Sequence, residues 1–252
     1  YITGFGGLYR QRMNAYGCMP EPAVSATDSK SKRPATTVPE TITPHLNVVY
    51  GQTGTRKLLA DIFVPKAGKG PFPAIVVVHG GGWMKGDKTK FRALAVALSE
   101  RGYVTMAVGY RLGHEAKFPA GIQDCNAAVR FLRAEAKQYH VNPEQIGAVG
   151  GSAGGHLVGL MAAAPDEKQL QGDAGHPDQT SRLQAAIVMA GPMEMASGTV
   201  AERSRKSGDK SYSNQWLGKS IDEAPELYKL SDAYLHFNKK TPQMRYTTKV
   251  IL

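Results

Sequence analysis

The sequence is poor in cysteine, with two among 252 residues. Cys18 stands in a polar N-terminal stretch, whereas Cys125 falls within a helical pattern. Neither has the spacing of metal ligands, and the pair does not indicate a disulfide framework. We therefore expect no metal site and interpret Cys125 as a small buried apolar residue.

Long apolar runs are also lacking, and none approaches the roughly 20 residues of a membrane span. We therefore expect no membrane span. Residues 1–16 lack the apolar run and small-residue cleavage site of a signal peptide. The first residue is Tyr1, so an export signal further upstream, and with it a secreted or periplasmic location, stays open. The compartment is unknown at this point.

Acidic residues are fewer than basic ones, 21 against 31, which gives a formal net charge of +10. The basic residues form two loose clusters: Arg203, Arg205, Lys206 and Lys210, then Lys239, Lys240, Arg245 and Lys249. No aromatic stacking platform or nucleic-acid motif accompanies them, so we expect no nucleic-acid partner. A solvated basic face is the simplest interpretation, with attraction to an acidic polymer or anionic surface as the alternative.

The chain divides by composition into an N-terminal arm and one folded domain. Residues 1–44 are assigned to a disordered or linker arm because residues 20–44 are rich in Pro, Ser, Thr and Lys. Residues 45–252 form the domain, beginning with a β-hairpin of residues 46–50 and 58–65. The run 74–78 is apolar without alternation, which indicates a strand covered on both faces.

Helical and strand patterns then alternate up to residue 190. The predicted helices and strands are 91–101 (helix), 103–108 (strand), 122–136 (helix), 146–149 (strand), 155–162 (helix) and 183–190 (strand). This order predicts βαβ units, hence an α/β fold with a mostly parallel sheet and helices on both faces.

Residues 193–243 break this alternation, being polar and basic with scattered aromatic residues. Their length suits a lid or insertion over a substrate cleft, built from short helices. A surface excursion with a few core anchors is the alternative. We expect the basic residues between Ala201 and Lys219 to lie on a mobile, exposed segment near the cleft mouth, pinned by Trp216 or Tyr212.

The pattern G-x-S-x-G occurs at residues 150–154, with Ser152 at its centre. An apolar strand precedes it and a small-residue helix follows, which is the context of a nucleophile elbow. Glycines two before and two after the serine remove side chains that would collide in so sharp a turn. Ser152 is therefore the candidate nucleophile, held in a strained conformation at the positive end of a helix dipole.

A second motif, His-Gly-Gly-Gly-Trp at residues 79–83, directly follows the strand 74–78. Consecutive glycines let backbone N–H groups approach a substrate and stabilise a developing oxyanion. A glycine run after a strand could instead hold a phosphate. However, the sequence contains no G-x-x-x-x-G-K-[ST] and no G-x-G-x-x-G, so we expect no nucleotide cofactor and no other cofactor.

Together these motifs resemble the α/β-hydrolases of the esterase/lipase group, which include hormone-sensitive-lipase-like carboxylesterases and bacterial feruloyl- or acetyl-esterases. The resemblance extends from about Leu46 to Pro242 and includes further short matches at 86–88, 110–112, 118–120 and 123–124. It implies a serine carboxylic-ester hydrolase with an acyl-enzyme intermediate, acting on short acyl esters such as acetyl- or feruloyl-type carbohydrate esters. It assigns Ser152 as nucleophile and the N–H groups of Gly81, Gly82 and Ala153 as the oxyanion hole.

Several other titratable residues have structural interpretations. In this fold the triad order is Ser, then Asp or Glu, then His, which argues against the two aspartates that precede Ser152. We expect hydrogen-bonding or capping roles for these residues: His79, Asp87, Asp124, His156, Asp232 and His236.

The triad acid and histidine are not identifiable in this chain, because no Asp, Glu or His follows His236. The resemblance fades at residues 243–252, where the family continues into a strand. We therefore expect a chain truncated at its C-terminus, with its last strands missing and an open sheet edge through which copies could self-associate. Two alternatives to an active esterase follow: an impaired or inactive hydrolase-fold binding module, or a basic surface-binding protein.

Overall fold

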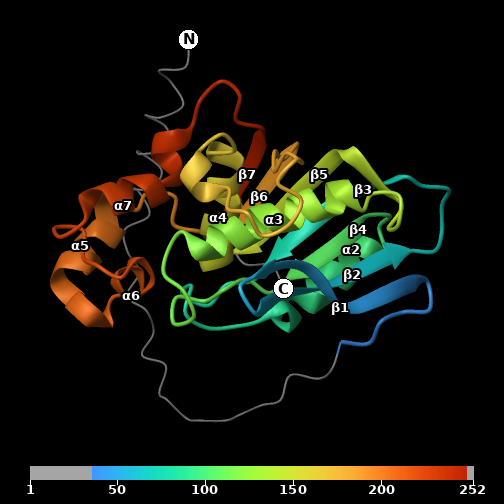
Figure 1. The fold of residues 1–252 in the computed structure, drawn as a ribbon, viewed down its shortest axis with the longest axis horizontal. Helices are drawn as coiled ribbons and strands as arrows, with labels where there is room; N and C mark the ends of the chain where they lie inside the picture. The colour runs from blue at the N-terminus through green and yellow to red at the C-terminus, as the bar shows by residue number, and fades with distance from the viewer. Residues whose placement is uncertain (1–35, 249–252) are drawn as a thin grey trace. The chain divides into compact units, whose positions relative to one another are not determined.

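The computed structural model describes residues 36–248, so Cys18, Lys249 and most of the predicted arm lie outside the described residues. Within this range the strands form one seven-stranded sheet in the order β1-β2-β4-β3-β5-β6-β7 (Figure 1). The two N-terminal strands pair antiparallel, as does β2 with β4, and the other neighbours are parallel. This confirms the predicted α/β fold.

The predicted N-terminal hairpin is formed by β1 (Ile42–Thr53) and β2 (Arg56–Pro65). Its first strand starts at Ile42 and not near Leu46, so residues 42–44 belong to the sheet and not to the arm. Pro44 made this stretch resemble a linker, but β1 is an edge strand, where a residue without an N–H is tolerated. Ile42 itself is buried beside Phe63, which anchors the strand.

The parallel part consists of β3 (Phe72–Val78), β4 (Val104–Val108), β5 (Val141–Gly151) and β6 (Ala185–Met189). Alternate residues of these strands face opposite layers. On one face, Val76 and Val78 join the core cluster built with helices α3 (Ala120–Ala134) and α4 (Ala153–Ala163). On the other, Val77 packs with α2 (Arg92–Ser99), so helices lie on both faces, as predicted.

The strand β7 (Gln243–Thr247) corrects the expectation that this chain lacks the strand with which the family continues after Pro242. It pairs parallel with β6 from Ala185↔Gln243 to Met189↔Thr247. Met244 and Tyr246 are partly buried against the larger core cluster, and this contact explains why so polar a segment forms a strand. The opposite face is less covered here, since Ile187 of β6 is 43% exposed.

The segment predicted as a lid or insertion does contain short helices, of which α5, α6 and α7 lie grouped together in Figure 1. These are α5 (Gly198–Ser207), α6 (Tyr212–Leu217) and α7 (Pro225–Ser231), with 3-10 turns η3 (Gly208–Lys210) and η4 (Ala233–His236). The basic residues of α5 and η3 are exposed, whereas Trp216 is buried. The mobility of this segment stays a prediction.

No helix among residues 36–248 is long and apolar enough to cross a membrane.

A buried carboxylate ties the hairpin to the layer that covers it. Asp61 on β2 is fully buried and accepts hydrogen bonds from Lys88 at 2.6 Å and Arg92 at 2.5 Å. Lys88 lies in the 3-10 turn η1 (Lys88–Phe91) that leads into α2, and Arg92 is the first residue of α2. The loop between α4 and β6 carries the remaining turn, η2 (Lys168–Leu170).

We expect Asp61→Ala to lower the free energy of unfolding by about 3 kcal/mol, because it leaves two cations without their buried partner. Urea denaturation measures this change. The matched control is Asp222→Ala, which removes the partner of Arg205 in a pair whose side chains are 65% and 51% exposed. The control should cost less than about 0.5 kcal/mol. Equal losses in the two variants would contradict the structural role given to Asp61.

Candidate active site

Ser152 stands at the turn between β5 and α4. Its backbone angles are φ 55° and ψ −124°, a conformation that non-glycine residues rarely adopt. Its side chain is exposed, although the flanking Gly151 and Ala153 are buried. The turn therefore presents the hydroxyl to solvent at the end of a buried strand, and its strained backbone is of the kind found at functional sites.

The turn is possible because the neighbouring glycines have no side chains. A Cβ on Gly150 would lie 2.3 Å from the carbonyl oxygen of Gly154. A Cβ on Gly154 would in turn lie 2.3 Å from the carbonyl oxygen of Val78 at the end of β3. Backbone atoms block both positions, so neither could accept even alanine without a shift of the α4 or β3 backbone.

The loop of residues 79–83 packs directly against this turn. A Cβ on Gly80 would lie 2.4 Å from the carbonyl oxygen of Gly151 and 3.1 Å from Cβ of Ser152. Gly81 and Gly82 have φ of 142° and 60°, which favour glycine. The Gly81 carbonyl accepts the N–H groups of Met84 and Lys85 and so closes the loop. The structure thus brings both sequence motifs together.

Three backbone N–H groups at this junction are unused. Those of Gly81, Gly82 and Ala153 donate no hydrogen bond within residues 36–248. The N–H of Ser152, by contrast, donates to the carbonyl of Met189 at 2.8 Å. Free N–H groups beside an exposed hydroxyl can stabilise a negatively charged oxygen that forms when the hydroxyl attacks a carbonyl.

His156 lies one helical turn after Ser152, but both of its ring nitrogens are engaged. Nδ1 accepts the indole N–H of Trp83 at 3.1 Å, and Nε2 donates to the carbonyl of Ser231 at 2.7 Å. The ring is fully buried, and this burial lowers its pKa to about 4. His156 is therefore a structural residue, as the family resemblance implied.

The other residues around the glycine loop also have structural partners. His79 stacks on Tyr110, and its Nδ1 lies 3.1 Å from the Gly80 carbonyl oxygen. Burial lowers the pKa of His79. Asp87 accepts the N–H of Thr89 and begins the turn η1.

Asp124 forms an ion pair with Arg111 at 2.7 Å and also accepts its backbone N–H. Burial raises the pKa of Asp124 despite the neighbouring guanidinium. Its carboxylate therefore fixes the strand-to-helix connection after β4, the structural role expected from its place near the start of α3.

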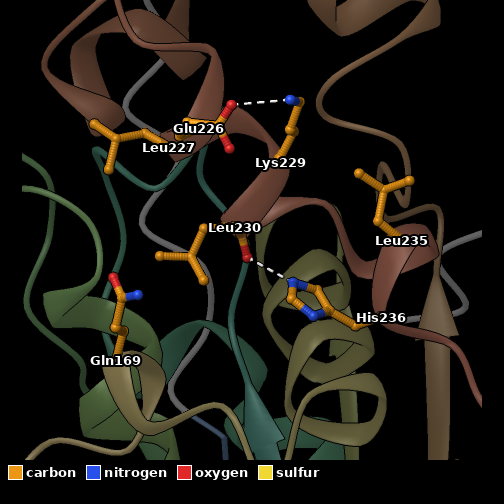
Figure 2. A pocket seen from close by; sticks show the side chains of 7 residues that line it. All are labelled: Gln169, Glu226, Leu227, Lys229, Leu230, Leu235 and His236. Carbon is orange, nitrogen blue, oxygen red and sulfur yellow. Dashed lines mark hydrogen bonds and ion pairs between the residues drawn. The ribbon is translucent and has the colours of Figure 1, made fainter.

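Asp232 and His236 are structural as well. Asp232 accepts the N–H groups of Met195, Ala196 and Leu235, and His236 Nε2 contacts the carbonyl of Leu230 at 3.0 Å. His236 and Leu230 line a surface hollow of about 380 Å³ that does not include Ser152 (Figure 2). All seven histidines of the chain lie within residues 36–248, and none hydrogen-bonds to Ser152.

One contact was not predictable from the motifs. Helix α6 lies on the glycine loop: Trp216 stacks on Trp83 with ring centroids 4.9 Å apart, and Tyr212 lies over Gly82. The i, i+4 spacing of these aromatic residues was the available signal. It indicated a common helix face, but not the surface against which that face packs.

The strand order, the turn at Ser152 and the adjoining glycine loop define an α/β-hydrolase fold. The family model BD-FAE matches residues 60–246. The chain belongs to the BD-FAE family.

Similar proteins include two from Mycobacterium tuberculosis. The chain is 33% identical to the carboxylesterase NlhH of Mycobacterium tuberculosis over 150 residues, which cover 58% of this chain and 45% of NlhH. It is 32% identical to the probable carboxylic ester hydrolase LipM of the same organism over 123 residues, covering 48% of this chain and 28% of LipM. The chain thus spans less than half the length of these relatives.

Two solved esterase structures are similar to this chain. A truncated carbohydrate esterase from gut microbiota superimposes with a TM-score of 0.72 at 26% identity, covering 81% of this chain and 75% of that one. The propionate-bound esterase Est2 of Thermogutta terrifontis gives 0.64 at 29% identity, covering 82% and 72%.

The buried state of His156 predicts a pH dependence of stability. Its folded pKa of about 4 lies below the ordinary value, so between about pH 6.5 and 4 the unfolded chain binds a proton that the folded chain excludes. Stability should therefore fall as pH falls through this window, with His156 contributing up to about 3 kcal/mol.

Urea denaturation at pH 7, 6, 5 and 4.5 measures this contribution as the difference between the wild type and His156→Gln. The variant should show the shallower loss of stability. His114→Gln is the matched control, since the side chain of His114 is exposed. Identical pH dependence in the wild type and His156→Gln would refute the assignment.

Proposed function

We propose that this protein is a serine carboxylic-ester hydrolase that works through an acyl-enzyme intermediate. The observation that carries the proposal is the exposed, strained Ser152 beside the unused N–H groups of Gly81, Gly82 and Ala153. Membership of the BD-FAE family supports it.

In the proposed reaction, Ser152 Oγ attacks the ester carbonyl and the carbonyl oxygen takes up negative charge. The three N–H groups stabilise this oxyanion, and the C–O bond to the alcohol then breaks as the proton lost by the Ser152 hydroxyl passes to the leaving oxygen. Water attacks the acyl-serine in the same way, releasing the acid and restoring the hydroxyl. We assign neither the base nor the triad acid, because no described histidine is bonded to Ser152.

We propose short acyl esters, or acetyl- or feruloyl-type esters of carbohydrates, as substrates. Two similar structures support this class: one is of a carbohydrate esterase and another holds propionate. We further propose that residues 193–243 act as the lid or insertion at the cleft, since α6 packs on the glycine loop. Self-association through the β7 edge of the sheet also remains a proposal.

A binding module without turnover is the second candidate. The missing hydrogen bond between Ser152 and any described histidine favours it, because a serine hydroxyl is a weak nucleophile without an adjacent base. The same site would then hold an ester or a carboxylate against the free N–H groups without cleaving it.

Ester hydrolysis by the full-length protein and by Ser152→Ala separates the two candidates. We expect the wild type to hydrolyse 4-nitrophenyl acetate and Ser152→Ala to lower kcat/KM by about 10⁴-fold or more. Thr55→Ala, which alters an exposed hydroxyl residue in the turn between β1 and β2, should leave the rate unchanged. Turnover that persists in Ser152→Ala would overturn the assignment of the nucleophile. Ester binding without turnover in the wild type would establish the binding module.

A further inference from the structure

The segment 193–243 carries two tyrosines with contrasting surroundings. Tyr228 is fully buried, and its hydroxyl contacts Asn214 at 2.5 Å and Ser204 at 2.9 Å. Tyr212 is 49% exposed, and its hydroxyl has no hydrogen-bond partner within residues 36–248. Tyr228 is therefore a structural anchor of this segment. The Tyr212 hydroxyl has no such structural role within residues 36–248.

Although exposed, Tyr212 is held in a defined place. Helix α6 is fixed by Trp216, four residues further on, which is buried and stacks on Trp83 at an interplanar angle of 14°. The carbonyl of Trp216 also accepts the N–H of Phe118 at 3.1 Å. Because residues i and i+4 share a helix face, anchoring Trp216 directs Tyr212 toward the same loop.

The surface under Tyr212 is Gly82. A Cβ built on Gly82 would lie 3.1–3.3 Å from three ring carbons of Tyr212, so the ring covers this glycine directly. Gly80, two residues earlier in the same loop, packs against Ser152. Tyr212 thus stands at the rim of the site, beside a proposed oxyanion donor, with about half of its surface open to solvent.

We propose that Tyr212 is a specificity-determining residue whose exposed ring stacks on an apolar ring face of the ester. This inference rests on the proposed function. The shared ligand chemistry is an apolar ring face, which either the C–H face of a sugar in the alcohol part or the aryl group of the acyl part can supply. Aromatic rings favour offset stacking, and tyrosine is suited to sites that are apolar on one side and wet on the other.

The test measures binding in the non-hydrolysing Ser152→Ala background of the full-length protein, so it needs no turnover. Isothermal titration calorimetry gives the Kd of three esters: methyl butyrate without a ring, an acetylated methyl xyloside with a ring in the alcohol, and methyl ferulate with a ring in the acyl group. Tyr212→Ala, Tyr212→Leu and Tyr212→Phe are compared. Leucine keeps an apolar cover over Gly82 without a flat ring, and phenylalanine keeps the ring.

We expect Tyr212→Ala and Tyr212→Leu to weaken binding of at least one ring-bearing ester by about three- to tenfold. Tyr212→Phe should change it less than about twofold, and methyl butyrate should be unaffected throughout. The ester that responds identifies the part of the substrate that stacks. Phe237→Ala is the matched control, removing a 39% exposed aromatic residue of the same segment that contacts Tyr234 and not the glycine loop.

Three results would overturn the inference: unchanged binding of both ring-bearing esters in Tyr212→Ala and Tyr212→Leu, equal weakening of all three esters, or no binding of a ring-bearing ester to the parent protein. Equal weakening would show that Tyr212 only supports the loop. The proposed function fails separately, if the protein with Ser152 intact hydrolyses none of these esters.

Discussion

The site depends on close backbone contact at the carboxyl ends of β3 and β5. Gly154 at the start of α4 lies against the carbonyl of Val78, and Gly80 in the loop after β3 lies against the carbonyl of Gly151, so each strand end fills the space that a side chain at the facing glycine would need. This contact holds Ser152 in its strained turn and places the glycine loop beside it. Parallel strands bring their carboxyl ends to one edge of a sheet, where ligand sites of α/β folds occur.

Aromatic packing extends this arrangement to the later part of the chain. Trp83, directly after the glycines, donates to His156 of α4 and stacks on Trp216 of α6. The ring of His156 also lies edge-on to Trp216 at 5.5 Å. One buried cluster thus joins the glycine loop, the helix after Ser152 and the segment 193–243, and a neutral His156 suits this apolar setting.

The sequence was informative where local chemistry decides the structure. Sharp turns need glycine and buried parallel strands need unbroken apolar runs, so the hairpin, the βαβ order and both motifs were predictable. The sequence was less informative where contacts between distant parts of the chain decide the structure. The polar segment β7 forms a strand because Met244 and Tyr246 pack against the core. Pro44 is tolerated within β1 because β1 is an edge strand. The position of Tyr212 over Gly82 depends on how α6 docks, which no motif encodes.

The most direct test of the account is where a fluorophosphonate probe reacts on the folded full-length protein, identified by mass spectrometry of its peptides. Because the strained turn exposes Ser152 beside free N–H groups, we predict one adduct, on Ser152, that is lost when the protein is unfolded in urea before labelling. Exposed Ser197 should remain unmodified as an internal control. No adduct on Ser152, or equal modification of both serines, would contradict the account.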